Sequence, residues 1–380
     1  MFAVKNGKII LEDGIEEGKV LLFSDKILGI VPESEIPADA EVIDANGGFV
    51  CPGLIDLHIH GYFGRDVCDA TVESLRVISK GILENGVTGY LPTTMTVDMT
   101  TITGAIDVCR TLMKEEDFDG ATILGVHAEG PFISPAKKGA QDERYILKPD
   151  ADFVKKHSDV IRVITLAPEE DAEGFPEIKR MAEETDVVVS MGHTTADFDT
   201  AYASTECGVR HATHLFNTMP PVAHRAPGVV GAVFASDVSC ELIVDTIHVH
   251  PVFYDVVYKV KGRKLCAITD CLPAGGLPEG EYTLGGTKFV YRDNICKLED
   301  GVTIAGSVLR LNKGVWNIYK NSTIPLHECV NCASLNPATT LGIADRKGSI
   351  KVGKDADIVI LDKEFNVEKT VVGGNIRYEA

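Results

Sequence analysis

Positive charge is scarce in this sequence of 380 residues. Lys and Arg together number 37 against 56 Asp and Glu, which gives a formal net charge of −19. Nucleic acids and anionic membranes attract basic surfaces, so we expect neither as a partner. An anionic substrate would need a local basic site that works against the overall field.

A disulfide framework and long apolar runs are missing as well. The ten cysteines are scattered without framework spacing, and the single CxxC, Cys329 and Cys332 beside His327, has no second pair nearby to complete a zinc site. No apolar run approaches the roughly 18 residues of a membrane helix. The opening segment MFAVKNGKII does not have the pattern of a signal peptide. We therefore expect reduced thiols, a cytoplasmic location and no membrane contact.

The two ends of the chain differ from its middle. Short β-like segments with turns cover 3–10, 18–31 and 40–50, and similar segments return at 347–362 and 366–380. We expect residues 1–50 and 347–380 to pack together as one small β domain. The larger domain, residues 51–346, would be inserted between them.

The middle of the chain alternates apolar strands with helical stretches, such as 71–86 and 197–208, which is typical of βα units with a parallel sheet. The predicted strands are 54–58, 87–91, 122–127, 161–166, 187–190, 209–214, 241–245 and 265–269. Eight such strands indicate an α/β fold of the (β/α)8 barrel type. A doubly wound sheet is the alternative, but it usually has fewer strands and a phosphate loop, and no GxGxxG or Walker pattern follows any strand.

Two histidines, His58 and His60, end the apolar segment LIDLHIH. Side chains two residues apart in a strand point to the same side, so both rings enter one space. A buried histidine pair is costly unless it is hydrogen-bonded or bound to a metal. The pair alone leaves both interpretations open.

Other polar residues follow the later strands: Glu129, His193, His214, His248 and Asp270. Taken singly, the carboxylates could cap helices or form ion pairs, and the histidines could bond backbone carbonyls in the core. In a barrel, however, the carboxyl ends of all strands meet at one mouth. This convergence favours metal ligands, and a set of imidazoles and carboxylates suits Zn²⁺ or Fe²⁺ better than Mg²⁺. Glu129 could bridge two ions.

Three further histidines are interpreted as structural. His157 has the surroundings of a solvated helix residue, and His211 lies on the face of its strand opposite to His214. His127 could face the mouth, but the ligand set is complete without it, so a ligand role for His127 is the less favoured alternative.

Several motifs together resemble a known family. They are CPGLIDLHIHG, HAEGPFISPAKKGAQ, MGHTTA, THLFNTMPP, HRAPGVVG, VDTIHV, TDCLPAGG, IAGSVL and the segment from NPATTLGI to KGSIKVGKDADIVILD. The chain resembles the amidohydrolase superfamily, most specifically its N-acetylglucosamine-6-phosphate deacetylases. The resemblance implies a TIM-like metal-dependent hydrolase barrel with a small β-sandwich domain formed by both termini.

The resemblance also implies the metal ligands. The main ion would be held by Glu129, His193 and His214, and a second ion by His58 and His60 with Glu129 bridging. Some members of the family replace the two histidines by amide residues and keep one metal, so one or two divalent ions per subunit are expected. The histidine pair in this chain favours two.

The implied reaction is hydrolysis of N-acetyl-D-glucosamine 6-phosphate to D-glucosamine 6-phosphate and acetate, in amino-sugar catabolism. Asp270 would act first as general base and then as general acid, and His248 would polarise the acetyl carbonyl. The implied substrate-binding residues are Ala140, Asn217, Thr218, Arg225, His248, Ile304, Ala305 and Gly306. Arg225 would reach the phosphate held by the neighbouring subunit of a homodimer. Thr218 and Ala226 depart from the Ala and Glu that are usual in the family, which bears on substrate detail.

Three alternatives remain open. The substrate could be the galacto epimer of the phosphorylated sugar, or the chain could be another amidohydrolase of the dihydroorotase or hydantoinase type. Many of the latter use a carboxylated lysine after the fourth strand, and VITLAPEED contains none. A barrel that has lost its activity is the third alternative, and the full ligand set argues against it.

Overall fold

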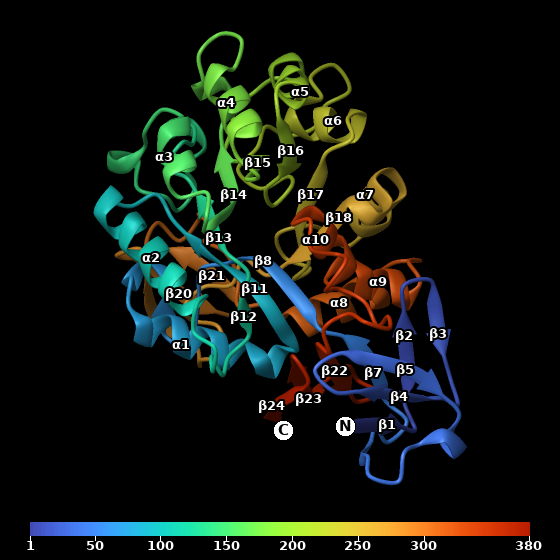
Figure 1. Ribbon diagram of the computed structural model, residues 1–380. Coiled ribbons are helices and arrows are strands. Elements are labelled where there is room, and N and C mark those ends of the chain that lie inside the picture. The colour runs from blue at the N-terminus through green and yellow to red at the C-terminus, as the bar shows by residue number, and fades with distance from the viewer.

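A barrel of parallel strands forms the larger part of the molecule. The computed structural model describes residues 1–380 (Figure 1). The barrel strands are β8 (Leu54–Ile59), β11 (Val87–Thr94), β13 (Val126–Glu129), β14 (Ile161–Leu166), β15 (Val188–Met191), β16 (Val209–Ala212), β17 (Ser239–Ile243) and β18 (Leu265–Ile268). They neighbour one another in that order, and the short β12 (Thr122–Ile123) pairs with β11. The predicted eight-stranded barrel is therefore confirmed.

The barrel closes between its first and last strands. The backbone N–H of Asp270 donates to the carbonyl of His58 at 2.9 Å. The hydroxyl of Thr269 donates to Asp56 Oδ2 at 2.6 Å. Closure brings the end of β18 beside the end of β8, so residues more than two hundred positions apart share one mouth.

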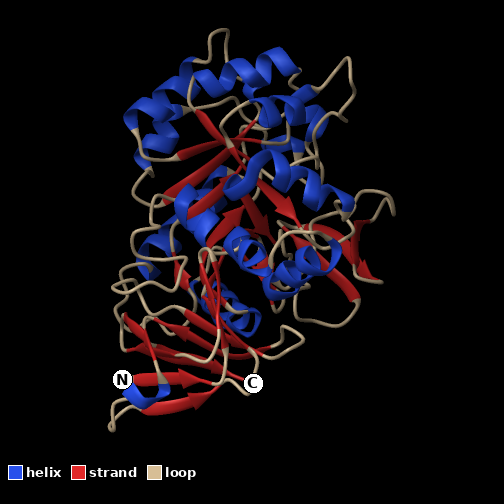
Figure 2. Ribbon diagram, turned by 90° about the vertical axis from the view of Figure 1, so that its right-hand side faces the viewer, coloured by secondary structure: helices blue, strands red, loops and turns tan.

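Helices surround these strands (Figure 2). They are α1 (Val72–Gly81), α2 (Met99–Leu112), α3 (Ala151–Lys156), α4 (Pro176–Glu184), α5 (Phe198–Glu206), α6 (Gly228–Ala235), α7 (Val252–Lys261), α8 (Leu311–Asn321), α9 (Leu326–Cys332) and α10 (Leu335–Thr340). Side chains cap the N-termini of three of these helices: Thr71, Asp98 and Asp197 each accept a backbone N–H of the first turn, in α1, α2 and α5. None of the helices combines the length and the apolar character needed to span a membrane.

Both ends of the chain build a second, smaller unit of two sheets. Its strands are β1 (Phe2–Lys5), β2 (Lys8–Leu11), β3 (Gly14–Glu16), β4 (Val20–Phe23), β5 (Ile27–Val31), β6 (Glu41–Asp44), β7 (Phe49–Pro52), β22 (Ile358–Leu361), β23 (Val367–Val372) and β24 (Asn375–Glu379). One sheet has the order β5-β4-β1-β6 and the other β24-β23-β22-β7-β2-β3. The antiparallel pairing of β22 with β7 joins the two ends of the chain. This confirms the small β-sandwich from both termini, while its boundaries at residues 50 and 347 stay predictions.

A three-stranded sheet outside the barrel follows β18. It consists of β19 (Gly280–Leu284), β20 (Thr287–Arg292) and β21 (Ile295–Leu298). The turn between β19 and β20 is held against the short hairpin β9 (Gly61–Tyr62) and β10 (Arg65–Asp66), because Asp66 Oδ2 accepts the N–H of Gly285 at 2.7 Å. This attachment keeps Leu284 at the mouth of the barrel, where it lines the central cavity.

Candidate active site

Two predicted histidine ligands lie against one carboxylate oxygen of the predicted ligand Glu129. Glu129 ends β13, and His193 and His214 follow β15 and β16. Glu129 Oε1 lies 2.9 Å from His214 Nε2 and 3.2 Å from His193 Nε2. The two Nε2 atoms are 3.1 Å apart. All three side chains are buried, so the structure brings these residues into one compact group.

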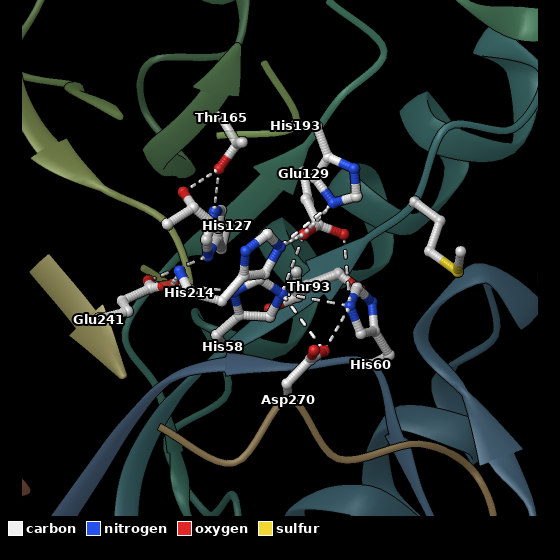
Figure 3. A network of polar contacts seen from close by, with 12 residues as sticks. His58, His60, Thr93, His127, Glu129, Thr165, His193, His214, Glu241 and Asp270 are labelled. Atoms are coloured by element: carbon white, nitrogen blue, oxygen red, sulfur yellow. Dashed lines mark hydrogen bonds and ion pairs between the residues drawn. The ribbon is translucent and has the colours of Figure 1, made fainter. Parts of the chain in front are cut away.

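A second group lies directly beside the first. His58 and His60, at the end of β8, place their Nε2 atoms 3.2 Å apart, and Asp270 Oδ1 lies 3.2 Å from His60 Nε2. Glu129 lies between the two groups, with Oε1 3.4 Å from His58 Nε2 and Oε2 3.4 Å from His60 Nε2 (Figure 3). The predicted convergence at the barrel mouth is therefore present in the structure.

The backbone is strained at three of these residues. His193, His214 and Asp270 have φ angles of 46°, 29° and 50°, in the left-handed region that side chains other than glycine rarely adopt. Each residue lies just beyond a barrel strand, where the chain turns sharply. Such strain concentrates at functional sites and persists only where the surroundings enforce it.

Hydrogen bonds at Nδ1 determine which ring nitrogen faces the mouth. The carbonyl oxygens of Thr93 and Lys137 accept from Nδ1 of His60 at 3.2 Å and of His193 at 2.8 Å. A carbonyl can only accept, so Nδ1 carries the hydrogen and, in the neutral ring, Nε2 keeps its lone pair. Nδ1 of His58 donates to Glu241 Oε2 at 3.0 Å, so Nε2 of His58 also keeps its lone pair in the neutral ring.

The inward-facing atoms are therefore mostly acceptors. Lone pairs of the imidazole Nε2 atoms point at the oxygens of Glu129 and Asp270, and His214 Nδ1 has no hydrogen-bond partner at all. Buried acceptors that face one another repel unless a cation lies between them. Nitrogen and carboxylate donors in this number suit a divalent transition metal, so the residues present fit a metal centre.

Electrostatics point the same way. Burial alone would raise the pKa of Glu129, but His58 and His193 hold it well below its usual value. Burial likewise opposes ionisation of Asp270, yet His58 and His60 lower its pKa. Both carboxyl groups are therefore ionised, which is the form in which a carboxylate binds a cation.

A cavity of about 190 Å³ opens onto both groups. The substrate-binding residues predicted from the sequence that line it are Ala140, Asn217, Thr218, His248, Ile304, Ala305 and Gly306. Arg225 does not line this cavity. It lies exposed at a tight turn closed by the bridge between Ala223 and Ala226, and it forms no ion pair within its own chain.

Asp245 holds His248 in the wall of the cavity. Asp245 Oδ2 accepts from His248 Nδ1 at 2.6 Å, and its Oδ1 accepts the backbone N–H groups of Ile247 and His248, each at 2.8 Å. Burial lowers the pKa of His248, but the bond to Asp245 and the charges of Asp245 and Asp270 raise it above its usual value. The ring is thus fixed, and its charged form is favoured.

Comparison with known proteins decides the family. The profile of the amidohydrolase family matches residues 49–377.

The chain belongs to the amidohydrolase family. It is 38% identical to the N-acetylglucosamine-6-phosphate deacetylase of Bacillus subtilis, over 99% of this chain and 93% of that protein. The crystal structure of the N-acetylglucosamine-6-phosphate deacetylase from Pasteurella multocida superposes with a TM-score of 0.92 at 34% identity, with 100% of each chain covered. The N-acetyl-D-glucosamine-6-phosphate deacetylase of Mycobacterium smegmatis, solved in complex with N-acetyl-D-glucosamine-6-phosphate, gives a TM-score of 0.90 at 26% identity and covers 99% of both chains.

The sequence did not single out three side chains that hold this amidohydrolase site together. Glu241 bonds His58, Asp245 bonds His248, and Gln141 Nε2 donates to Glu129 Oε2 at 2.5 Å. A carboxylate at the first position of the predicted strand 241–245 was the available signal for Glu241, and a carboxylate three residues before a histidine was the signal for Asp245. Gln141 lies in an irregular loop, which offers no such signal.

The remaining histidines of the amidohydrolase barrel have other surroundings. His127 donates from Nδ1 to the carbonyl of Leu57 at 2.9 Å, and its Nε2 lies 2.7 Å from Thr165 Oγ1, so both nitrogens are engaged. Burial lowers its pKa to about 3. The prediction that His157 is solvated is wrong: it is buried at the end of α3, where it packs on Phe153.

Proposed function

We propose that this amidohydrolase removes the acetyl group of N-acetyl-D-glucosamine 6-phosphate and releases D-glucosamine 6-phosphate and acetate, as a step of amino-sugar catabolism. The observation that carries the proposal is the shared cavity in which Asp270 and His248 lie beside two ligand groups joined by Glu129. The near full-length similarity to deacetylases of that name supports the choice of substrate. The ten free cysteines suit the reducing cytoplasm.

In this proposal, Glu129, His193 and His214 would hold a main divalent ion, and His58 and His60, with Glu129 and Asp270 beside them, would hold a second one. Zn²⁺ and Fe²⁺ suit these donors best. When bound, such an ion supplies Lewis acidity and lowers the pKa of water to about 7.

Asp270 moves the proton. Its carboxylate lies at the cavity wall, ionised, with Oδ1 near His60. It accepts the proton of the attacking water as the new C–O bond forms, and it returns that proton to the sugar nitrogen as the C–N bond breaks. Without this return, the amine would be a poor leaving group.

His248 stabilises the acetyl oxygen. Because Nδ1 donates its hydrogen bond to Asp245 and the charged form of the ring is favoured, Nε2 also carries a hydrogen, which it can donate. That hydrogen meets the carbonyl oxygen as it gains negative charge in the tetrahedral transition state. Because the ring is already fixed, little reorganisation is needed during the reaction.

The sugar and its phosphate take the outer part of the cavity. The residues that line the cavity and would contact the sugar are Ala140, Asn217, Thr218, Ile304, Ala305 and Gly306. We assign the phosphate to Arg225 of a second copy of the chain, since a guanidinium binds phosphate bidentately and Arg225 lies outside the cavity of its own subunit.

An exposed apolar surface supports this homodimer. Val252, Val256 and Val260 follow one another at helical spacing on α7 and are 57%, 39% and 48% exposed. The ring of Phe253, also on α7, packs on Phe216 of the loop that leads to Arg225, at 5.0 Å between ring centroids. A second copy that covers this helix face would lie beside the arginine loop.

Acetate release tests the proposed function. The metal-loaded protein should release acetate from N-acetylglucosamine 6-phosphate faster than from the galacto epimer or from either unphosphorylated sugar. Dihydroorotate and hydantoin serve as controls for the alternative amidohydrolase activities. Absence of acetate from all four sugars, with metal present, would exclude the function; faster release from the galacto epimer would correct the substrate.

Combining His58→Gln with His60→Asn should lower the metal content from about two ions to about one per subunit, since one ion loses two of its ligands. Activity should fall only in part, because the group of Glu129, His193 and His214 is untouched. Elemental mass spectrometry of the purified protein measures the change, with His327→Gln, outside the cavity, as control. An unchanged metal content would contradict the two-ion centre.

A further inference from the structure

We propose that Glu241 is a positioning residue that orients one ligand in each of the two metal groups. The inference rests on the metal centre of the proposed function and adds a residue that touches neither metal nor substrate. Glu241 lies in β17 and its side chain is fully buried. A carboxylate in such a place is costly unless its oxygens are bonded.

One carboxylate oxygen serves both groups. Glu241 Oε2 accepts from His58 Nδ1 at 3.0 Å and from the backbone N–H of His214 at 3.1 Å. Figure 3 shows Glu241 on the side of His58 and His214 that faces away from Asp270 and His60. The same atom therefore reaches a ligand of the main group and a ligand of the second group.

For His58, this bond fixes the ring. His60 and His193 are oriented by backbone carbonyls, which the strands hold in place. His58 is oriented by a side chain, so a substitution can remove that support. A carboxylate at Nδ1 also makes the opposite nitrogen a stronger metal ligand.

For His214, the bond holds the backbone. Its Nδ1 has no hydrogen-bond partner, so nothing at that nitrogen holds the ring. The direction of the ring therefore depends on the main chain, which has a φ angle of 29° at this residue. Glu241 holds that strained main chain by its N–H.

Two histidines lie beside the other carboxylate oxygen of Glu241. Glu241 Oε1 forms no hydrogen bond, and His211 Nε2 lies 3.4 Å and His127 Nδ1 3.8 Å away from it. His211 Nδ1 lies 2.6 Å from Ser239 Oγ. His211 therefore lies between Ser239 and Glu241, on the side of the carboxylate that faces away from the metal groups.

Metal affinity tests the inference. Glu241→Gln keeps the shape of the side chain and one oxygen but removes the negative charge that makes Nε2 of His58 a stronger metal ligand, and Glu241→Ala removes both contacts. We expect the dissociation constant for Zn²⁺, measured by competition with a chromophoric chelator, to rise about 10- to 100-fold in Glu241→Gln and further in Glu241→Ala. The control is Asp357→Asn, a buried carboxylate bonded to Lys347 in the small domain, which should bind Zn²⁺ as the wild type does.

Thermal unfolding separates positioning from mere structural support. Without metal, Glu241→Gln and Asp357→Asn should both unfold at a lower temperature than the wild type. Added Zn²⁺ should raise the Tm of Asp357→Asn as much as that of the wild type, and that of Glu241→Gln by less. If Glu241→Ala does not fold, the Gln variant alone decides.

Wild-type Zn²⁺ affinity in Glu241→Gln, or an equal loss in Asp357→Asn, would overturn the inference. These measurements need no substrate. If the wild type binds Zn²⁺ but releases no acetate, the proposed function is rejected. The role of Glu241 is then still decided by the Zn²⁺ affinities and Tm values of the variants.

Discussion

Replacing Asp270 by Asn is expected to lower kcat by at least about 10³-fold while the fold and most of the metal remain. The amide cannot take the proton of water or return it to the amine. It has the size of the carboxylate, and asparagine tolerates the left-handed backbone found here, where φ is 50°. The change should therefore remove the proton transfer and little else.

Steady-state acetate release, metal content and Tm of the purified variant check this expectation. Asp357→Asn, the same exchange at a buried carboxylate of the small domain, is the matched control and should keep its kcat. If Asp270→Asn retains a tenth of the wild-type rate, another group acts as the base.

Arg225→Ala should raise KM for the phosphorylated sugar by an amount worth about 2–4 kcal/mol, or roughly 30- to 700-fold, as expected for the loss of a charge-assisted partner. The guanidinium also offsets the acidic field of a chain with net charge −19. The effect should shrink for the unphosphorylated sugar. Arg210→Ala, an exposed arginine elsewhere, should leave KM unchanged.

Mixing subunits tests whether Arg225 acts across the dimer. Arg225→Ala and Asp270→Asn proteins are unfolded together and refolded. In a mixed dimer, one cavity combines an intact Asp270 with the partner's intact arginine, and the other cavity carries both defects. Random pairing then restores roughly a quarter of the wild-type activity. No recovery after verified exchange of subunits would mean that Arg225 acts in its own subunit or away from the phosphate.

The barrel could be predicted from the sequence because its strands are buried on both faces, so each strand appears in the sequence as a short apolar run. LIDLH and IRVITL coincide with β8 and β14 to within a residue. The polar residues after these runs could be assigned to one mouth because barrel geometry alone brings strand ends together. That rule needs no side-chain detail.

The supports of the site were beyond this reasoning. Glu241 lies within a strand and not after one, so the rule that finds ligands at strand ends passes over it. Gln141 reaches Glu129 from a loop whose path depends on tertiary contacts. His157 has polar neighbours in sequence, yet the fold packs it on Phe153 and bonds it to Arg110 of another helix. Contacts with residues so distant in the sequence cannot be predicted from the residues next to His157 or Gln141.

The pairing of β7 with β22 also sets the order in which the molecule can be completed during translation. All barrel strands leave the ribosome before Ile358–Leu361 does, so β7 must wait beside a growing barrel with one edge unpaired. An unpaired edge invites association with other chains. A chain released early, before residues 358–379, would keep every residue of the cavity and still carry this open edge. We therefore expect such truncated chains to aggregate although they retain every catalytic residue.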